Sequence, residues 1–146
     1  MFKKILVPLD GSKKSYKDLE IACELALKLD AEINILSVFK HHSFMEASLS
    51  MMKGRDELEN LDEILSQYSK EIVSKGKEML TKKGLTNVRG FVKVGTAAKE
   101  ILEFAKEHEN DLIVIGSQGH GDLSGYLLGG VSHKVTGLAK CPVMVV

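Results

Sequence analysis

The sequence predicts an α/β fold in which one doubly wound, five-stranded parallel sheet carries helices on both faces. Apolar runs of strand length alternate with longer segments whose apolar residues recur at helical spacing. A strand–helix–strand order that repeats without interruption implies parallel strands joined by right-handed crossovers. The length of 146 residues suits one domain, which we expect to span 1–146.

Each expected element has its own local signal. The first strand is expected at 3–9, where the apolar run Ile5-Leu6-Val7 is followed by Pro8 and the turn residues Asp10-Gly11-Ser12. The other strands are expected at 32–39, 88–94, 112–115 and 143–146. Helices are expected at 15–29, 56–83, 95–107 and 126–138, the first opening with a capping box of Ser15 and Asp18. Residues 41–55 show no clean period, and we interpret them as a mobile excursion.

Composition and charge narrow the class of protein. Lysine plus arginine and aspartate plus glutamate both number 20, and the chain has no tryptophan, so we expect no nucleic-acid partner. The apolar runs are too short to cross a membrane, so we expect no membrane association. Cys23 and Cys141 form no metal-binding pair and are too few for a disulfide scaffold, which favours a cytoplasmic location.

Glycines concentrate in the segment between the fourth strand and the last helix. Six of the thirteen lie within fifteen residues: Gly116, Gly119, Gly121, Gly125, Gly129 and Gly130. Glycine lets backbone N–H groups approach an anion, and a helix N-terminus adds about half a positive charge, so this segment suits phosphate. The alternative is an ordinary flexible loop. In a doubly wound sheet the ligand binds beyond the carboxyl ends of the strands, so the loops after the first, second and fourth strands are the informative ones.

The glycine spacing is specific: Gly116, two residues, Gly119, nine residues, Gly129. With the phrases at 5–12, 115–121, 129–132 and 141–146, it closely resembles the universal stress protein family over essentially the whole chain. The resemblance implies a five-stranded parallel sheet of the adenine nucleotide α-hydrolase-like kind and cytoplasmic homodimers. In one subclass of the family it also implies bound ATP.

Carried onto this chain, the resemblance places Asp10 beside the nucleotide, Val38 in backbone contact with adenine, and Gly116, Gly119 and Gly129 at ribose and phosphates. The remaining expected cofactor-binding residues are Pro8, Leu9, Ser117, His120, Gly130, Val131 and Ser132. The expected cofactor is ATP, ADP or AMP, with any Mg²⁺ held mainly by the phosphates. Without the resemblance, Asp10 is read equally well as part of a turn with a helix cap.

One position departs from the family pattern. Gly130 stands where the nucleotide-binding members have serine or threonine, so one hydroxyl donor to phosphate is missing. Losing one hydrogen bond removes on the order of 1 kcal/mol, roughly a fivefold weakening. Closer approach of the Gly130 backbone, or a contact from Ser132, would offset that loss.

The sequence lacks the motifs of a P-loop, a zinc site and a nucleophile elbow. The segment at 11–15 lacks the glycine spacing of a P-loop, and Lys13 and Lys14 are interpreted as solvated first-turn residues. The five histidines show no zinc-ligand spacing and are expected at the surface, and Ser117 is not in a nucleophile elbow. We therefore predict no metal site and no catalytic residue.

These observations favour an adenine-nucleotide-binding module in stress response or signalling. The alternatives are a slow ATP hydrolase and a nucleotide-free structural homodimer. A homodimer is expected through the strand at 143–146, because a short, wholly apolar edge strand pairs readily with a second copy.

Overall fold

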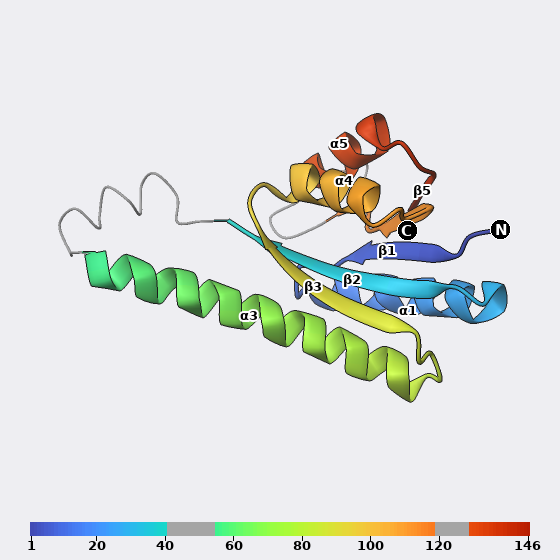
Figure 1. Cartoon of the computed structure of the whole chain (residues 1–146), viewed down its shortest axis with the longest axis horizontal. Coiled ribbons are helices and arrows are strands. Elements are labelled where there is room, and N and C mark those ends of the chain that lie inside the picture. The colour runs from blue at the N-terminus through green and yellow to red at the C-terminus, as the bar shows by residue number, and fades with distance from the viewer. Residues whose placement is uncertain (41–54, 119–128) are drawn as a thin grey trace.

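The computed structural model describes residues 1–40, 55–118 and 129–146. Strands and helices alternate along the chain as expected (Figure 1). The elements are β1 (Lys4–Pro8), α1 (Lys13–Leu29), β2 (Glu32–Phe39), α3 (Arg55–Lys82), β3 (Val88–Val94), α4 (Ala97–Glu107), β4 (Leu112–Ile115), α5 (Gly130–Leu138) and β5 (Val143–Val145). Apart from Arg55, which opens α3, the excursion proposed at 41–55 lies outside the described residues.

The five strands form one parallel sheet in the order β3-β2-β1-β4-β5. Strand β1 lies at the centre, with Ile5 opposite Ile33 of β2 on one side and Leu112 of β4 on the other. The chain builds outward to β3, returns across the sheet to β4, and ends at β5 on the opposite edge. This order confirms the predicted doubly wound fold and places its switch point between β1 and β4.

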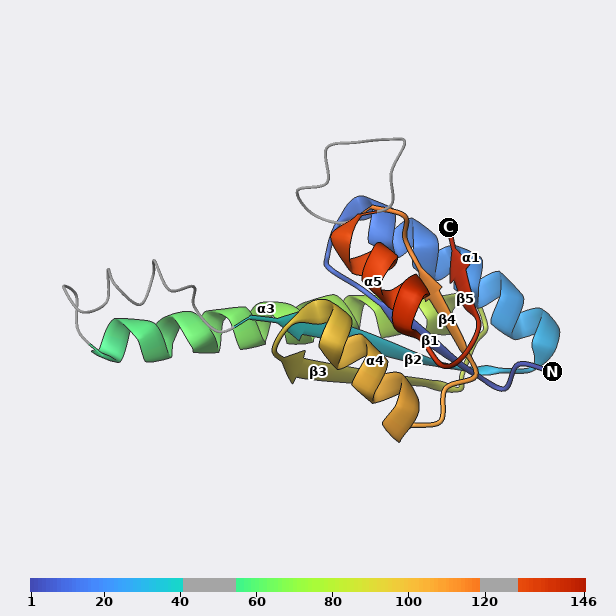
Figure 2. The ribbon, with the colours of Figure 1, turned by 90° about the horizontal axis from the view of Figure 1, so that it is seen from above.

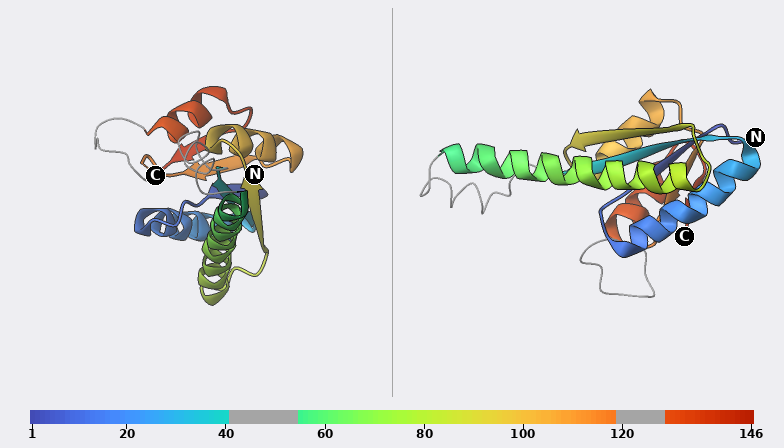
Figure 3. Two further views of the ribbon diagram at one scale, coloured as in Figure 1. Left: turned by 90° about the vertical axis from the view of Figure 1, so that its left-hand side faces the viewer. Right: turned by 90° about the horizontal axis from the view of Figure 1, so that it is seen from below.

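Two apolar cores lie on the two faces of the sheet. Helices α1 and α3 cover one face, and α4 and α5 cover the other (Figures 1 and 3). Successive side chains of β1 point to opposite faces of the sheet and contribute to both cores. Ile5 and Val7 pack toward α1 and α3, and Leu6 packs toward α4 and α5. Strand β4 divides its four buried side chains in the same way. A sheet buried on both faces explains why its central strands read as continuous apolar runs.

Helix α1 begins two residues earlier than predicted. Ser12 is its N-cap, in extended conformation, and the Ser12 Oγ accepts a hydrogen bond from the Ser15 N–H at 3.1 Å. The predicted capping box of Ser15 and Asp18 is therefore wrong, because Ser12 already caps the helix and Asp18 lies on its buried face. Asp18 is instead paired with Lys14.

Helix α3 lies within one residue of its predicted bounds, and α4 begins two residues later than predicted, at Ala97 after Thr96 as N-cap. Helix α5 starts at Gly130 after Gly129 as N-cap, and the earlier start predicted at 126 lies outside the described residues. The N-terminal part of α3 projects beyond the sheet (Figure 2). Within the described ranges, no helix is long and apolar enough to span a membrane.

The burial of the cysteines and histidines agrees only in part with the burial predicted from the sequence. Cys23 is buried in the core under α1, as expected, and Cys141 is half-buried, both as free thiols. Burial raises the pKa of both thiols, which lowers their reactivity. His133 is exposed, but His108 is half-buried and stacks on Phe104 with 3.8 Å between ring centroids, so a surface position was wrong for His108.

Candidate functional site

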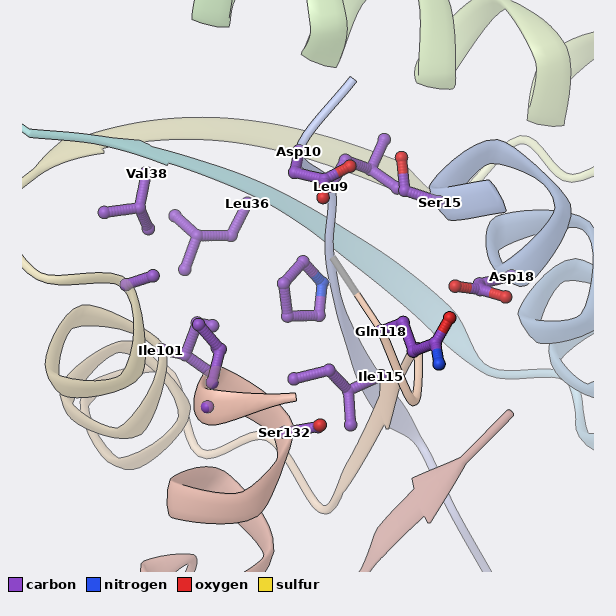
Figure 4. Close-up of a pocket in the computed structure, with 15 residues that line it drawn as sticks. Leu9, Asp10, Ser15, Asp18, Leu36, Val38, Ile101, Ile115, Gln118 and Ser132 are labelled. Carbon is purple, nitrogen blue, oxygen red and sulfur yellow. The ribbon is translucent and has the colours of Figure 1, made fainter. Parts of the chain in front are cut away.

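A cavity of about 370 Å³ opens beyond the carboxyl ends of β1, β2 and β4, at the switch point of the sheet (Figure 4). It is lined by Pro8, Leu9, Asp10, Ser15, Asp18, Leu36, Val38, Ala97, Ile101, Ile115, Gly116, Gln118, Gly130, Val131 and Ser132. The lining comes from three strand ends and from the N-terminal turns of α1, α4 and α5. A pocket at this place in a doubly wound sheet is the expected ligand site.

Most of the site residues predicted from the sequence meet in this cavity. Those that line it are Pro8, Leu9, Asp10, Val38, Gly116, Gly130, Val131 and Ser132. Ser117 and Gly129 are not in the lining, but the Gly129 N–H donates to the Ser117 carbonyl at 2.8 Å and holds the two loop ends together. Gly119 and His120 lie outside the described residues.

The two ends of the cavity differ in polarity. In Figure 4, Leu36, Val38 and Ile101 lie on one side, and Asp18 and Gln118 lie on the other. Ala97, the first residue of α4, adds a small side chain to the lining. A ligand with a flat apolar part and a polar tail matches this arrangement.

Asp10 follows β1 directly and contributes to a turn. Its Oδ1 accepts a hydrogen bond from the Ser12 N–H at 2.9 Å, which leads into the Ser12 cap of α1. The same side chain lines the cavity. The turn reading of Asp10 is therefore confirmed, and it is compatible with a role toward a ligand.

The first residues of α5, Gly130, Val131 and Ser132, line the cavity. Gly129, the N-cap, is in extended conformation and, as a glycine, supplies no side chain to cap the helix. The first intrahelical bond in this turn runs from the His133 N–H to the Gly129 carbonyl at 2.9 Å. The preceding N–H groups, at Gly130, Val131 and Ser132, have no acceptor within the helix and carry its positive dipole end. They form a favourable position for an anion.

The Ser132 hydroxyl stabilises this helix start. Its Oγ lies 3.0 Å from the Gly129 carbonyl and 3.2 Å from the Ser117 carbonyl, in donor geometry to both, and the residue is buried. The Ser117 N–H in turn donates to the Val146 carbonyl at 3.0 Å. The Ser132 hydroxyl proton is thus bonded to backbone and does not replace the donor missing at Gly130.

Asp18 lines the cavity, although its sequence context predicted only a helix-capping role. This carboxylate is only 6% exposed, lines the cavity, and is 3.0 Å from the Lys14 Nζ. Burial raises the pKa of Asp18, although the Lys14 ammonium acts in the opposite direction. A usable signal was present, because Asp18 interrupts the buried face of α1 that Ser15, Leu19 and Ala22 define.

The structure also corrects the interpretation of Lys14 as a solvated first-turn residue. Beyond its ion pair with Asp18, its Nζ donates to the Val146 carbonyl at 3.1 Å, so it is more than a solvated first-turn residue. The other lining residues that the sequence did not single out are Ser15, Leu36, Ala97, Ile101, Ile115 and Gln118. Across the described part of the chain, no three His, Cys, Asp or Glu side chains gather closely enough to hold a metal ion.

Comparisons with known proteins agree with this geometry. The sequence model of the Universal stress protein family matches residues 1–146. Universal stress protein YxiE of Bacillus subtilis is 40% identical over 149 residues, which cover 100% of this chain and 99% of that protein.

Solved structures show the same fold. Universal stress protein UspA from Lactobacillus plantarum superposes with a TM-score of 0.85 at 23% identity, covering 99% of this chain and 97% of that one. The universal stress protein from Archaeoglobus fulgidus in complex with dAMP has a TM-score of 0.68 at 20% identity, with coverage of 99% and 97%. With the family match over the whole length, the chain belongs to the universal stress protein family.

Proposed function

We propose that this chain is an adenine-nucleotide-binding module that acts in stress response or signalling. The observation that carries the proposal is a single cavity that joins an apolar end, the Asp10 carboxylate and the uncapped N-terminus of α5. These three features match the three parts of a nucleotide.

Each part has a complementary surface. Leu36, Val38 and Ile101 offer an apolar slot for the adenine ring. Asp10 can accept hydrogen bonds from ribose hydroxyls, because a carboxylate provides several acceptor positions. The first-turn N–H groups of α5 donate to phosphate oxygens.

The relatives support an adenine nucleotide. The Archaeoglobus fulgidus protein with this fold is described in complex with dAMP. We extend this to ATP, ADP or AMP as the ligand here, with any Mg²⁺ held mainly by the phosphates. We also propose that the protein is located in the cytoplasm.

A nucleotide-free structural homodimer is the second candidate. Gly130 lacks the hydroxyl of the nucleotide-binding family members, and the edge strand β5 leaves Met144 and Val145 exposed. Pairing of β5 with a second copy would cover both side chains. This dimer is compatible with nucleotide binding as well as with its absence.

The experiment is to denature the purified full chain and identify any released nucleotide by mass spectrometry. Calorimetric titration of the nucleotide-stripped protein with AMP, ADP and ATP then gives the affinities. We expect an adenine nucleotide in the released fraction and saturable binding. No released nucleotide and no binding at millimolar concentrations would contradict the proposal and favour the structural homodimer.

A turnover assay on the same preparation tests the remaining alternative, a slow ATP hydrolase. We expect ATP to be hydrolysed at the background rate. Hydrolysis above background that disappears when binding is abolished would establish an enzyme.

A further inference from the structure

The charge of the cavity wall is unusual for a phosphate-binding site. Its described lining contains two carboxylates, Asp10 and Asp18, and none of these lining residues is lysine, arginine or histidine. The sequence of segment 119–128, which follows Gln118, contains His120 and Asp122 but neither lysine nor arginine. Positive charge toward phosphate in the described lining therefore comes from the dipole at the start of α5 and not from a cationic side chain.

Asp18 lines the cavity beside the loop that follows β4. Its Oδ2 lies so close to Gly116 that a Cβ added to this glycine would collide with it. The carboxylate is therefore held against the backbone of the loop after β4, which is part of the cavity wall. In Figure 4 it lies on the same side as Gln118, away from the apolar end.

Lys14, the ion-pair partner of Asp18, lies toward solvent and not toward the cavity. The Lys14 Nζ contacts the two Asp18 oxygens at 3.0 and 3.3 Å and the Val146 carbonyl at 3.1 Å. The Lys14 side chain is 41% exposed and does not line the cavity. The ion pair thus directs its negative end into the cavity and its positive end toward solvent.

With its base at the apolar end, a nucleotide would hold its phosphates at the start of α5, in the same cavity that Asp10 and Asp18 line. The helix dipole amounts to about half a positive charge, which compensates only part of one phosphate. Each further phosphate adds negative charge near Asp18 and Asp10. Like charges in a partly buried site repel each other more strongly than they do in bulk water.

This inference rests on the proposed function. We propose that Asp18 makes the pocket select adenine ligands by charge, favouring adenosine and AMP over metal-free ADP and ATP. Lys14 moderates the selection by offsetting part of the Asp18 charge. A divalent cation on the phosphates lowers the charge of ATP and restores part of its affinity.

The test is calorimetric titration of the full chain with adenosine, AMP, ADP and ATP, with and without Mg²⁺. Wild type is compared with Asp18→Asn, Lys14→Met and Glu78→Gln. Glu78→Gln changes the net charge as Asp18→Asn does, but it lies on the exposed surface of α3, in an ion pair with Lys82. It is the control for an effect of total charge.

We expect wild type to bind metal-free ATP more weakly than AMP. Asp18→Asn should tighten metal-free ATP by about fivefold or more while adenosine changes by less than about twofold. Lys14→Met should widen the gap between AMP and ATP, and Glu78→Gln should leave it unchanged. Thermal unfolding checks that each variant is folded. If Asp18→Asn does not fold, the affinities of Lys14→Met for AMP and ATP test the inference.

Three outcomes would overturn the inference. They are equal affinity of wild type for AMP and metal-free ATP, a change by one common factor for all four ligands in Asp18→Asn, and an identical effect of Glu78→Gln. Failure of the proposed function is a different result, because wild type would then bind none of the four ligands. That result would remove this inference as well.

Discussion

Asp10 contributes to the turn after β1 and also lines the cavity, so its two roles need separate variants. Asp10→Ala should weaken AMP, ADP and ATP by a similar factor, because all three share the ribose. Charge-assisted hydrogen bonds contribute about 1.5 to 3 kcal/mol each, so at least a tenfold loss is expected by calorimetry.

Asp10→Asn is the matched control for this experiment. Its amide oxygen retains an acceptor for the Ser12 N–H, while the charge toward the ligand is lost. Loss of affinity in both variants, with unchanged thermal unfolding of Asp10→Asn, assigns the carboxylate to the ligand. A defect confined to ATP with Mg²⁺ would assign Asp10 to the metal, and no defect would leave it in the turn alone.

Gly130 is a position where the missing hydroxyl can be added. Among the described residues, no atom lies within 4 Å of a Cβ built at Gly130, so this part of the structure leaves room for a side chain. Gly130→Ser should tighten nucleotide binding by roughly fivefold, because one new hydrogen bond contributes on the order of 1 kcal/mol. Gly130→Ala supplies the Cβ without the hydroxyl, and equal affinity of the two variants would contradict the role of the hydroxyl.

Asp18 also affects stability, and the direction follows from its pKa. Because burial raises this pKa above 3.8, the native state binds the proton more tightly than the unfolded state does. The stability that Asp18 contributes is therefore present below the unfolded pKa and is lost as pH rises through the raised native pKa.

Asp18→Asn removes the free-energy cost of burying a charged carboxylate, since the amide does not ionise. In urea unfolding from pH 4 to 7, the stability of the variant relative to wild type should increase with pH and then level off. Lys14 is part-exposed, so water can solvate it once its partner is neutral. A variant less stable than wild type at pH 7 would show that the Lys14 ion pair outweighs the burial cost.

At the scale of elements, α3 packs onto the sheet through close approaches at glycine. A Cβ at Gly76 would come within 2.9 Å of the Leu9 Cδ1 and 3.1 Å of the Ile35 Cδ1. Gly76→Ala should therefore lower the free energy of unfolding by about 1 to 3 kcal/mol through overpacking. This cost exceeds the gain of up to about 1 kcal/mol in helix propensity.

Gly137 in α5 is the matched comparison, because a Cβ there meets no atom of the described residues within 4 Å. Gly137→Ala should raise the free energy of unfolding by up to about 1 kcal/mol. Urea unfolding of both variants measures the two effects. Changes of the same sign would contradict the packing argument for Gly76.

At the scale of the whole molecule, the sheet order places β5 at an edge, as the sequence analysis expected. We expect this edge to pair with a second copy of the chain. Val145→Lys should convert the dimer into a monomer in sedimentation, because a charged side chain on an edge strand opposes pairing.

The opposite edge of the sheet offers the control. Val94 ends β3, the other edge strand, and is 39% exposed, close to the 37% of Val145. Val94→Lys should leave the dimer intact. A dimer that survives Val145→Lys, or that is lost equally in both variants, would exclude β5 as the interface.

The sequence by itself determined the alternation of elements and much of the ligand pocket. Ile5-Leu6-Val7 and Leu112-Ile113-Val114-Ile115 are apolar because β1 and β4 are buried on both faces, where apolar side chains are favoured. The turn after β1 could also be predicted, since turn and cap preferences act between residues that are neighbours in sequence.

Only the tertiary structure decided which distant segments meet. Ala97 and Ile101 of α4 join the pocket because the sheet order places α4 beside the carboxyl end of β2. Asp18 faces the cavity, and Lys14 reaches Val146, because α1 packs beside the loop after β4. Local periodicity reports which face of a helix is buried, but the groups that it is buried against depend on the arrangement of the whole sheet.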